Sequence, residues 1–465
     1  MPIIIPANSA ASGGYEVANS QRFNSASSNY LNRTFSSSPT LATKCTLSLW
    51  LKMAALGTNR SPIFANGNGG GINLRTDDQI NFYNASGSLR TTQVFRDTSA
   101  WYHIVFVTDT TLGTADDRLK VYVNGTQVTD FSNRSNPSQN ATSSLGSATA
   151  HDIGRNNSPA NYYNGYISEL VFIDGQALDP TSFGEFDGDS EIWKPINVSA
   201  LTFGTNGYYL DFEDSSALGN DAVGSNNFGA NAAAIDQSTD TCTNNFCTLN
   251  PLIKFNSSYS VALSNGNTTL GTSTGDTNSN PTPATFGITT GKWYWETKFV
   301  SLASGTAYAL TGIMAQNPAG EGNYLGGYND SYGYGSWNGV VYNNGGSTGN
   351  TTGGATYGVG DILSMAFDAD NNRLYYYKNG AIQNSGTGIV IPAASTTVLG
   401  AWFPAVGDWG STTHVWSCNF GNGFFGTTAV TTNSGNGYAG ADGKSKFNYA
   451  VPSGYSALST KGLNQ

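Results

Sequence analysis

A short stretch of sequence occurs twice in this chain of 465 residues, once in each half. Residues 115–125 read ADDRLKVYVNG and residues 369–380 read ADNNRLYYYKNG. Each stretch has an acidic turn, Arg-Leu, an alternating run of aromatic or β-branched residues, and then Asn-Gly. Asn-Gly at this position indicates a two-residue hairpin turn, because both residues tolerate positive φ. The two stretches therefore predict β-hairpins in both halves, and we expect a β-sandwich around each.

The composition also favours an all-β fold. Charged residues make up 11% of the chain, so strong helix formers such as Lys, Glu and Arg are scarce. Aromatic residues reach 12% and Gly fills 57 positions, which suits strands joined by tight turns. The aromatic content and the small net charge per residue exclude the disordered class. This composition therefore predicts an all-β protein with many turns.

The net charge and the length of the apolar runs restrict the classes of partner that we expect. The net charge is −10 and no basic cluster occurs, so we expect no nucleic-acid partner. No apolar run approaches the ~20 residues of a membrane span, so we expect no membrane insertion.

Cys242 and Cys247 could form a disulfide that closes a small loop, and unbridged thiols are the alternative.

The chain divides into five predicted parts. These are an extended N-terminal arm at 1–19, a sandwich at 20–180, a connector at 181–250, a second sandwich at 251–430, and a C-terminal segment at 431–465 that packs on the second sandwich. The connector carries aromatic residues that need burial, so we expect it to be ordered against its neighbours.

Several strand motifs resemble known families. SLWLK, WYHIVFV, RLKVYVNG and NGYISELVFIDGQAL follow the order seen in laminin-G-like domains of the concanavalin A-like lectin/glucanase superfamily. In the second half, GKWYWE, GDILSMAFDADNNRLYYYKNG and the pair FPAV and VWSCNFG resemble a SPRY domain. Both resemblances imply sandwiches of two antiparallel sheets. We therefore expect two antiparallel jelly-roll β-sandwiches in tandem, joined by an ordered connector.

The order of the two domains and the segment FNYAVPSGYSAL resemble structural proteins of tailed bacteriophages. The resemblance implies a protein of the virion surface, on a tail fibre or tail appendage or as a head decoration. Its expected partners are host-surface glycans and, through the N-terminal arm, other virion proteins. Such appendages are commonly trimers, so we expect a homo-oligomer, although no residue pattern specifies a three-fold seam. The alternatives are a purely architectural cement protein of capsid or tail and a glycan-degrading enzyme of the glucanase type.

We find no catalytic set in the sequence. The chain has only three histidines, His103, His151 and His414, so few side chains could serve as the base of a Ser or Cys nucleophile. Glycosidases need two positioned carboxylates, and the Glu-x-Asp-x-x-Glu pattern of the glucanases is absent. Asp211 and Glu213 in LDFEDS are the candidate carboxylate pair. We therefore expect the protein not to be an enzyme.

The segment 323–350 is the candidate glycan-binding site, because it interleaves aromatic residues with Gly, Asn and Ser. Aromatic faces beside amide and hydroxyl groups suit sugars, and they also occur in protein-recognition loops. The alternative is that these aromatics fill the core of the second sandwich. The candidate residues are Tyr324, Tyr328, Tyr332, Tyr334 and Trp337.

Calcium is the only cofactor that the sequence suggests, and we expect none to be required. Laminin-G-like domains often hold calcium through loop carboxylates, and hard oxygen ligands suit that ion. The candidate ligands are Asp116, Asp117 and Asp152. The alternative is that these aspartates cap turns through their own backbone.

Overall fold

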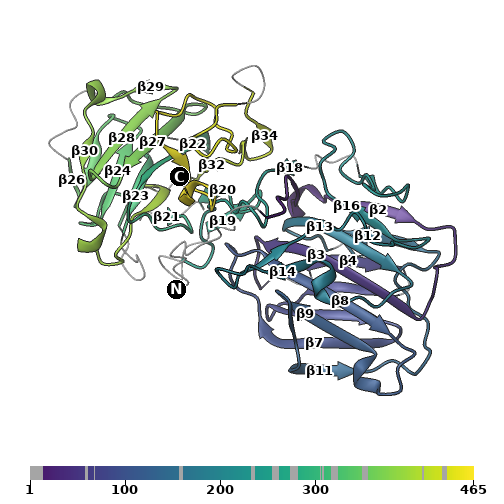
Figure 1. The fold of residues 1–465 in the computed structure, drawn as a ribbon. Helices are drawn as coiled ribbons and strands as arrows, with labels where there is room; N and C mark the ends of the chain where they lie inside the picture. The colour runs from purple at the N-terminus through teal and green to yellow at the C-terminus, as the bar shows by residue number, and fades with distance from the viewer. Residues whose placement is uncertain are drawn as a thin grey trace. The chain divides into compact units, whose positions relative to one another are not determined.

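A computed structural model of the chain shows an all-β protein, as predicted (Figure 1). It describes residues 14–57, 61–67, 69–156, 161–231, 236–253, 261–272, 281–303, 305, 308–315, 323–347, 354–410, 413–431 and 437–464. Backbone contacts divide the described chain into a first unit that ends at residue 244 and a second unit that begins at residue 245. No helix in the described part is long and apolar enough to cross a membrane.

The described residues of the first unit form two antiparallel sheets of eight strands each. One sheet has the order β10 (Thr126–Gln127), β9 (Leu119–Val123), β8 (Tyr102–Asp109), β3 (Lys44–Met53), β13 (Gly165–Asp174), β1 (Ser20–Phe23), β18 (Asp236–Ser238), and β16 (Tyr208–Leu210) also pairs with β13. The other has the order β11 (Phe131–Ser135), β7 (Gly87–Val94), β6 (Gln79–Asn84), β5 (Gly71–Leu74), β4 (Ser61–Asn66), β12 (Ala150–Ile153), β2 (Leu31–Thr34), β17 (Gly229–Ala230). A small hairpin joins β14 (Gly184–Phe186) to β15 (Trp193–Pro195), and the 3₁₀ turns are η1 (Ser25–Ser27), η2 (Ala115–Asp117) and η3 (Pro180–Ser182).

Strand β3 shows how the sequence pattern builds this unit. Successive side chains of a strand point to opposite faces. Leu47, Leu49 and Leu51 accordingly enter the core between the sheets. Trp50 and Lys52 lie on the other face, where they are buried as well. The outer face of this sheet is therefore a second buried surface.

The chain after residue 181 buries that outer face. Val171 and Ile173 of β13 pack there against Phe183, Val198 and Tyr209. The predicted connector thus supplies strand β16 and part of the cover of the first unit.

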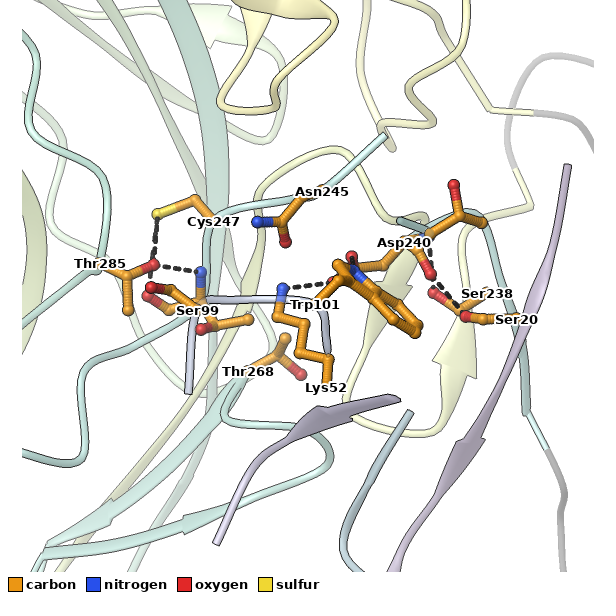
Figure 2. Close-up of polar contacts among 12 residues, drawn as sticks. Ser20, Lys52, Ser99, Trp101, Ser238, Asp240, Asn245, Cys247, Thr268 and Thr285 are labelled. Carbon is orange, nitrogen blue, oxygen red and sulfur yellow. Dashed lines mark hydrogen bonds and ion pairs between the residues drawn. The ribbon is translucent and has the colours of Figure 1, made fainter. Parts of the chain in front are cut away.

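Two buried ion pairs hold the end of this segment. Arg22 of β1 contacts Asp236 at 2.6 Å, and Lys52 of β3 contacts Asp240 at 2.8 Å. The other carboxylate oxygen of Asp240 accepts a hydrogen bond from the Trp101 indole N–H at 3.1 Å. Figure 2 shows Lys52 and Trp101 converging on Asp240. Because both carboxylate oxygens have donors, the buried charge of Asp240 is satisfied.

Residues 14–19, the described part of the predicted N-terminal arm, pack on the first unit. Val17 is buried, and its backbone N–H donates to Thr243 Oγ1 at 3.0 Å. The Tyr15 hydroxyl hydrogen-bonds the Tyr209 hydroxyl at 3.0 Å. The packed part of the chain therefore begins before residue 20, and residues 1–13 of the predicted arm lie outside the described residues.

The described residues of the second unit form sheets of nine and six strands. The larger has the order β19 (Val261–Ser264), β20 (Thr269–Thr272), β32 (His414–Asn419), β22 (Lys292–Leu302), β27 (Ile362–Asp368), β28 (Arg373–Lys378), β29 (Ala381–Ile382), with β30 (Ile389–Val390) on β28 and β35 (Ser456–Ala457) parallel to β22. The smaller has the order β21 (Thr282–Pro283), β31 (Phe403–Asp408), β23 (Ala309–Met314), β24 (Ser331–Gly335), β25 (Val341–Asn343), β26 (Gly346–Ser347). The remaining elements are β33 (Phe424–Phe425), β34 (Thr428–Ala429), η4 (Asn384–Gly386), η5 (Ala394–Thr396) and η6 (Gly462–Asn464).

The two Asn-Gly hairpins have the same construction. Asn124 has φ 47° and Asn379 has φ 48°, and the glycines after them have φ 78° and 80°. Positive φ at both positions is the requirement of a type I′ turn. Each Asn side chain also accepts a backbone N–H of the adjoining strand, from His103 at 2.8 Å and from Ile362 at 2.9 Å. The repeated sequence therefore encodes the same local hydrogen bonds in both units.

The C-terminal segment is anchored to the second unit through Glu296. This buried carboxylate of β22 accepts the backbone N–H groups of Asn448 and Tyr449, both at 2.8 Å. Phe447 packs edge-on against Tyr294 with ring centroids 4.8 Å apart. Hydrogen bonds and ring packing together hold the start of the FNYAVPSGYSAL segment to β22, and β35 near its end pairs with the same strand.

Candidate functional site: an aromatic patch on the second unit

Partly exposed aromatic side chains gather on the outer face of the six-stranded sheet. Tyr308 immediately precedes β23 and Trp409 immediately follows β31, and the Trp409 backbone N–H donates to the Tyr308 carbonyl at 2.8 Å. Tyr324 and Trp337 lie in the loops before and after β24, and Tyr342 lies on β25. We call Tyr308, Tyr324, Trp337, Tyr342 and Trp409 the aromatic patch.

The rings of the aromatic patch contact one another. Tyr324 stacks on Trp409 with ring centroids 5.0 Å apart, and Trp337 stacks on Tyr342 at 5.3 Å. Trp337 and Trp409 are 5.7 Å apart, and Tyr308 contacts both at 5.3 and 5.4 Å. These distances lie within the range of favourable aromatic pairs. Because Trp409 is 41% exposed, the stacked rings form a surface that solvent reaches.

A buried apolar layer supports the patch from below. On β23, Ala309 and Ile313 point into the core between the sheets, whereas Leu310 and Met314 point outward. Tyr324, Trp337 and Tyr342 pack on the outward group. The residues of this layer are Leu310, Met314, Leu325, Tyr328 and Ala405. The alternation of one central strand thus decides which face of the sheet carries the aromatic residues.

Hydrogen bonds fix the loop that presents Tyr324. The Asn323 backbone N–H donates to the Tyr328 hydroxyl at 3.0 Å, and its side-chain amide donates to the Gly327 carbonyl at 2.8 Å. At the rim, the Asn338 amide donates to the Tyr342 hydroxyl at 2.7 Å. Burial raises the pKa of the Tyr324 hydroxyl, which keeps its proton as a donor. The patch therefore combines apolar faces with amide and hydroxyl groups.

The structure separates the five predicted glycan-binding residues. Tyr324 and Trp337 are in the aromatic patch, and Tyr328 is buried beneath it. Tyr332 and Tyr334 instead point into the core, because alternate positions of β24 share a face. Tyr332 packs against Trp402 at 5.7 Å and Tyr334 against Tyr376 at 5.2 Å.

Tyr308, Tyr342 and Trp409 complete the patch and were not among the predicted site residues. Tyr308 and Trp409 are 101 positions apart in sequence and become neighbours because β23 pairs with β31. No short stretch of sequence contains both residues, so a local sequence pattern cannot indicate the pair. An exposed Trp between two apolar strands, as in VGDWG, is a cue that could have drawn attention to Trp409.

Both units match known families. Residues 25–181 match the Laminin_G_3 family, described as the concanavalin A-like lectin/glucanases superfamily, and residues 292–418 match the SPRY domain family. The chain therefore carries a concanavalin A-like domain followed by a SPRY domain. A search of curated proteins found no match.

Three solved structures are among those similar to the chain. The SPRY domain of human HERC1 is 18% identical, with a TM-score of 0.29, 37% of this chain covered and 96% of that chain. Another human SPRY domain is 19% identical, with a TM-score of 0.28 and coverage of 35% and 96%. A protein of Bacteroides ovatus ATCC 8483, provisionally named a carbohydrate binding protein, is 14% identical, with a TM-score of 0.35 and coverage of 48% and 60%. This chain thus spans less than two thirds of the Bacteroides protein.

The three predicted calcium ligands of the concanavalin A-like domain do not form a joint site. Each carboxylate is paired with a cationic side chain of its own, and Asp152 is buried. Within the described residues, no three acidic, His or Cys side chains are grouped so that they could hold a metal ion. These three aspartates therefore do not act together as ligands of one calcium ion. The pairs are Asp116 with Arg134 at 3.1 Å, Asp117 with Lys120 at 3.4 Å, and Asp152 with Arg155 at 3.0 Å.

A Ser–His pair in this domain has the wrong hydrogen-bond direction for catalysis, because the histidine donates to the serine. His103 Nε2 lies 2.8 Å from Ser48 Oγ, and His103 Nδ1 accepts the indole N–H of Trp193 at 2.8 Å. An indole is a donor only, so the imidazole proton resides on Nε2 and points at the serine. Burial lowers the pKa of His103 to about 3, which keeps the ring neutral. The imidazole therefore cannot accept the Ser48 proton in this tautomer.

Asp211 and Glu213 form a turn. The Glu213 backbone N–H donates to Asp211 Oδ1 at 3.1 Å, and the Glu213 side chain is exposed. Burial raises the pKa of Asp211. This local bond is the ordinary capping role of an aspartate.

Glu169 is an unusual buried acid that sequence inspection did not single out. It lies at a bulge of β13, between the stretches that pair with β1 and with β16, and it has φ 48°. Its carboxylate accepts the Tyr209 hydroxyl at 2.7 Å and the Tyr15 hydroxyl at 3.4 Å. Burial, with a smaller contribution from the charge of Asp211, raises the pKa of Glu169 to about 8.

The four cysteines all lie in the described part of the chain and form no disulfide. Cys45, Cys247 and Cys418 are buried, and Cys242 is half-buried. The bridge between Cys242 and Cys247 that the sequence left open is therefore not formed.

Proposed function

We propose that this chain is a glycan-binding surface protein and that the aromatic patch of the SPRY domain is its main contact face. The observation that carries the proposal is the stacked, solvent-accessible arrangement of Trp337, Trp409 and Tyr324. Large aromatic rings are normally buried, and a cluster of them at the surface is the usual mark of a contact site. The concanavalin A-like superfamily match of the other domain supports carbohydrate as the ligand class.

The chemistry of the patch suits a sugar ring. The C–H faces of a pyranose pack on indole and phenol rings, while Asn338 and the tyrosine hydroxyls can exchange hydrogen bonds with sugar hydroxyls. The patch is exposed to solvent, so one site is expected to bind weakly. Several copies on one particle would raise the overall avidity without any new contact.

We further propose a tailed-bacteriophage virion as the setting, with the protein on a tail appendage or the head. The support is the order of the two domain types and the C-terminal segment at 447–458. In this proposal the N-terminal residues attach a homo-oligomer, trimeric in the simplest case, to other virion proteins. A purely architectural cement role is the alternative.

We propose that the protein is not an enzyme and requires no cofactor. Two observations support this proposal: His103 donates its hydrogen bond to Ser48 and cannot act as its base, and Asp211 and Glu213 form a local turn. Release of reducing ends from host polysaccharide by the purified chain would contradict this proposal.

Replacing Trp409 by Ala is expected to weaken glycan binding at least about tenfold, because truncating an aromatic anchor commonly costs more than ~1.4 kcal/mol. The measurement is retention on a glycan array followed by titration calorimetry with the retained glycan. Phe186→Ala, which removes an exposed aromatic ring of the other unit, is the matched control and should bind normally. Unchanged binding by the Trp409 variant would refute the patch, and no retained glycan with the wild-type protein would favour the cement role.

Deleting residues 1–13 is expected to abolish incorporation into particles and to leave thermal unfolding unchanged. The cut stops at residue 13 because Tyr15 and Val17 pack on the first unit. Immunogold labelling of particles measures incorporation. Labelling at the wild-type level would contradict the proposed attachment through these residues.

A further inference from the structure

The geometry points to a second glycan-binding site, specific for neutral glycans, in a polar groove of the concanavalin A-like domain. The groove lies between the end of β7 in one sheet and the β9–β10 hairpin in the other. The inference rests on the proposed function only in its ligand class, since the groove and the aromatic patch belong to different units. It adds a second binding site and a preference for neutral glycans, which the aromatic patch does not provide.

The groove has the size and the lining of a sugar site. Its volume is about 560 Å³, within the range of small-molecule sites. Three threonines and the amides of Gln93, Asn124 and Gln127 line it, together with two valines and Asp130. Amides offer both donors and acceptors, which matches the mixed hydrogen-bonding needs of neighbouring sugar hydroxyls.

The polar side chains at the mouth have no partners within the described part of the protein. Gln93, Gln127 and Asp130 are exposed, and none of the side-chain hydrogen bonds or ion pairs of the described residues uses them. By contrast, the amide of buried Asn84 bonds Thr108 and Ser143, both at 2.9 Å. The groove thus concentrates uncommitted hydrogen-bonding groups that a bound glycan could use.

The hairpin wall of the groove, which carries Gln127, is held in place by local contacts. At the hairpin turn, Asn124 Oδ1 accepts the backbone N–H of His103, and a Cβ at Gly125 would come within 2.4 Å of the Trp193 ring. The Val128 N–H donates to the Val121 carbonyl at 2.9 Å, which holds the chain leaving the hairpin. A preformed site loses little conformational entropy when it binds its ligand.

The charge of the groove selects neutral glycans. Asp130 is the only charged residue among its lining residues, and no Lys or Arg of the described chain lines it. A sialic or uronic acid would bring a second carboxylate next to Asp130 without a cation between them, which is repulsive. The chain as a whole, with net charge −10, adds to this repulsion.

The test uses the full chain and arrays that carry neutral hexose hexamers and uronic acid hexamers. The variant Trp337→Ala/Trp409→Ala removes the patch, and it should still retain neutral hexamers. Adding Gln93→Ala and Gln127→Ala should weaken this residual binding at least about tenfold, since each lost hydrogen bond costs about 1 kcal/mol. Gln139→Ala, which removes an exposed amide outside the groove, is the matched control and should change nothing.

Asp130→Asn in the same background should admit uronic acid hexamers. If the patch variant retains no neutral hexamer that the wild-type protein binds, the groove is refuted and the patch stands. If the patch variant binds like the wild type, the proposed patch fails and the groove stands. Residual binding that survives the loss of both glutamines, or continued exclusion of uronic acid hexamers by the Asp130→Asn variant, would also refute the groove.

Discussion

Replacing Lys52 by Met is expected to destabilise the first unit by about 3–5 kcal/mol, because it leaves the Asp240 carboxylate buried without its cation. Both side chains are 1% exposed and their charged atoms are 2.8 Å apart. Water cannot take the place of the ammonium group at such a site, so the whole desolvation cost of the carboxylate remains. Urea unfolding followed by tryptophan fluorescence measures the loss.

Two matched variants make this test specific. Lys44→Met breaks a partly exposed pair of the same strand, with Lys44 33% exposed, and should cost no more than about 1 kcal/mol. The double variant Lys52→Met/Asp240→Leu should recover part of the lost stability, because it removes the unpaired charge but leaves the buried Trp101 indole N–H without its acceptor. Equal losses for Lys44→Met and Lys52→Met would contradict the buried-pair argument.

The predictable part of the fold rests on local sequence rules. Leu47, Leu49 and Leu51 alternate as a strand requires, and they enter the core as the pattern indicates. The two Asn-Gly turns adopt positive φ because their residues tolerate it. Family resemblance supplied the sandwich architecture, and both families match. Rules of this kind need no knowledge of distant contacts.

The rest of the molecule depends on partners far apart in sequence. Lys52 is buried because Asp240, 188 positions later, returns to it, and nothing around residue 52 signals that return. Likewise, a strand rich in aromatic residues does not reveal which of them point into the core and which point to the outer face of the sheet. Tyr332 and Tyr334 were therefore predicted in the site but lie in the core, whereas Trp409 reaches the surface beside Trp337.

The two candidate sites differ in how they could be found. The aromatic patch has a partial signal in the sequence, because Tyr324 and Trp337 lie in a segment rich in Gly and Asn. The polar groove has none, because Thr, Gln and Asp are ordinary surface residues. What distinguishes Gln93 and Gln127 is that they line one groove, from the end of β7 in one sheet and from edge strand β10 in the other. Neither side chain has a hydrogen-bond partner within the described chain.

Raising the pH from 5 to 8 is expected to destabilise the first unit by roughly 1.4 kcal/mol per pH unit through Glu169 alone. The pKa of Glu169 is about 8 in the folded chain and 4.5 in a model peptide. Between these values the unfolded chain has released the proton and the folded chain still holds it. Stability therefore falls as pH rises, and the loss is complete once the pH exceeds the folded pKa.

The surroundings of Glu169 explain why its ionised form is disfavoured. Tyr15 and Tyr209 supply hydroxyl donors, while the charges that act on the carboxylate come from Asp211 and Glu213, which are both acidic. Burial removes water, and none of these groups supplies a compensating cation. Ionisation would thus place a third negative charge beside two others, next to the packed residues 14–19.

Glu169→Gln is expected to remove this pH dependence, because the amide keeps the shape of the side chain and carries no titrating proton. At pH 8 the variant should be more stable than the wild-type protein, whereas at pH 5 the two should differ little. Urea unfolding across this pH range measures the slope, and Glu213→Gln, an exposed acid on the same side, is the control that should keep it. An unchanged slope in the Glu169 variant would show that another group carries the linkage. A flat wild-type profile would show that the buried carboxylate is already compensated.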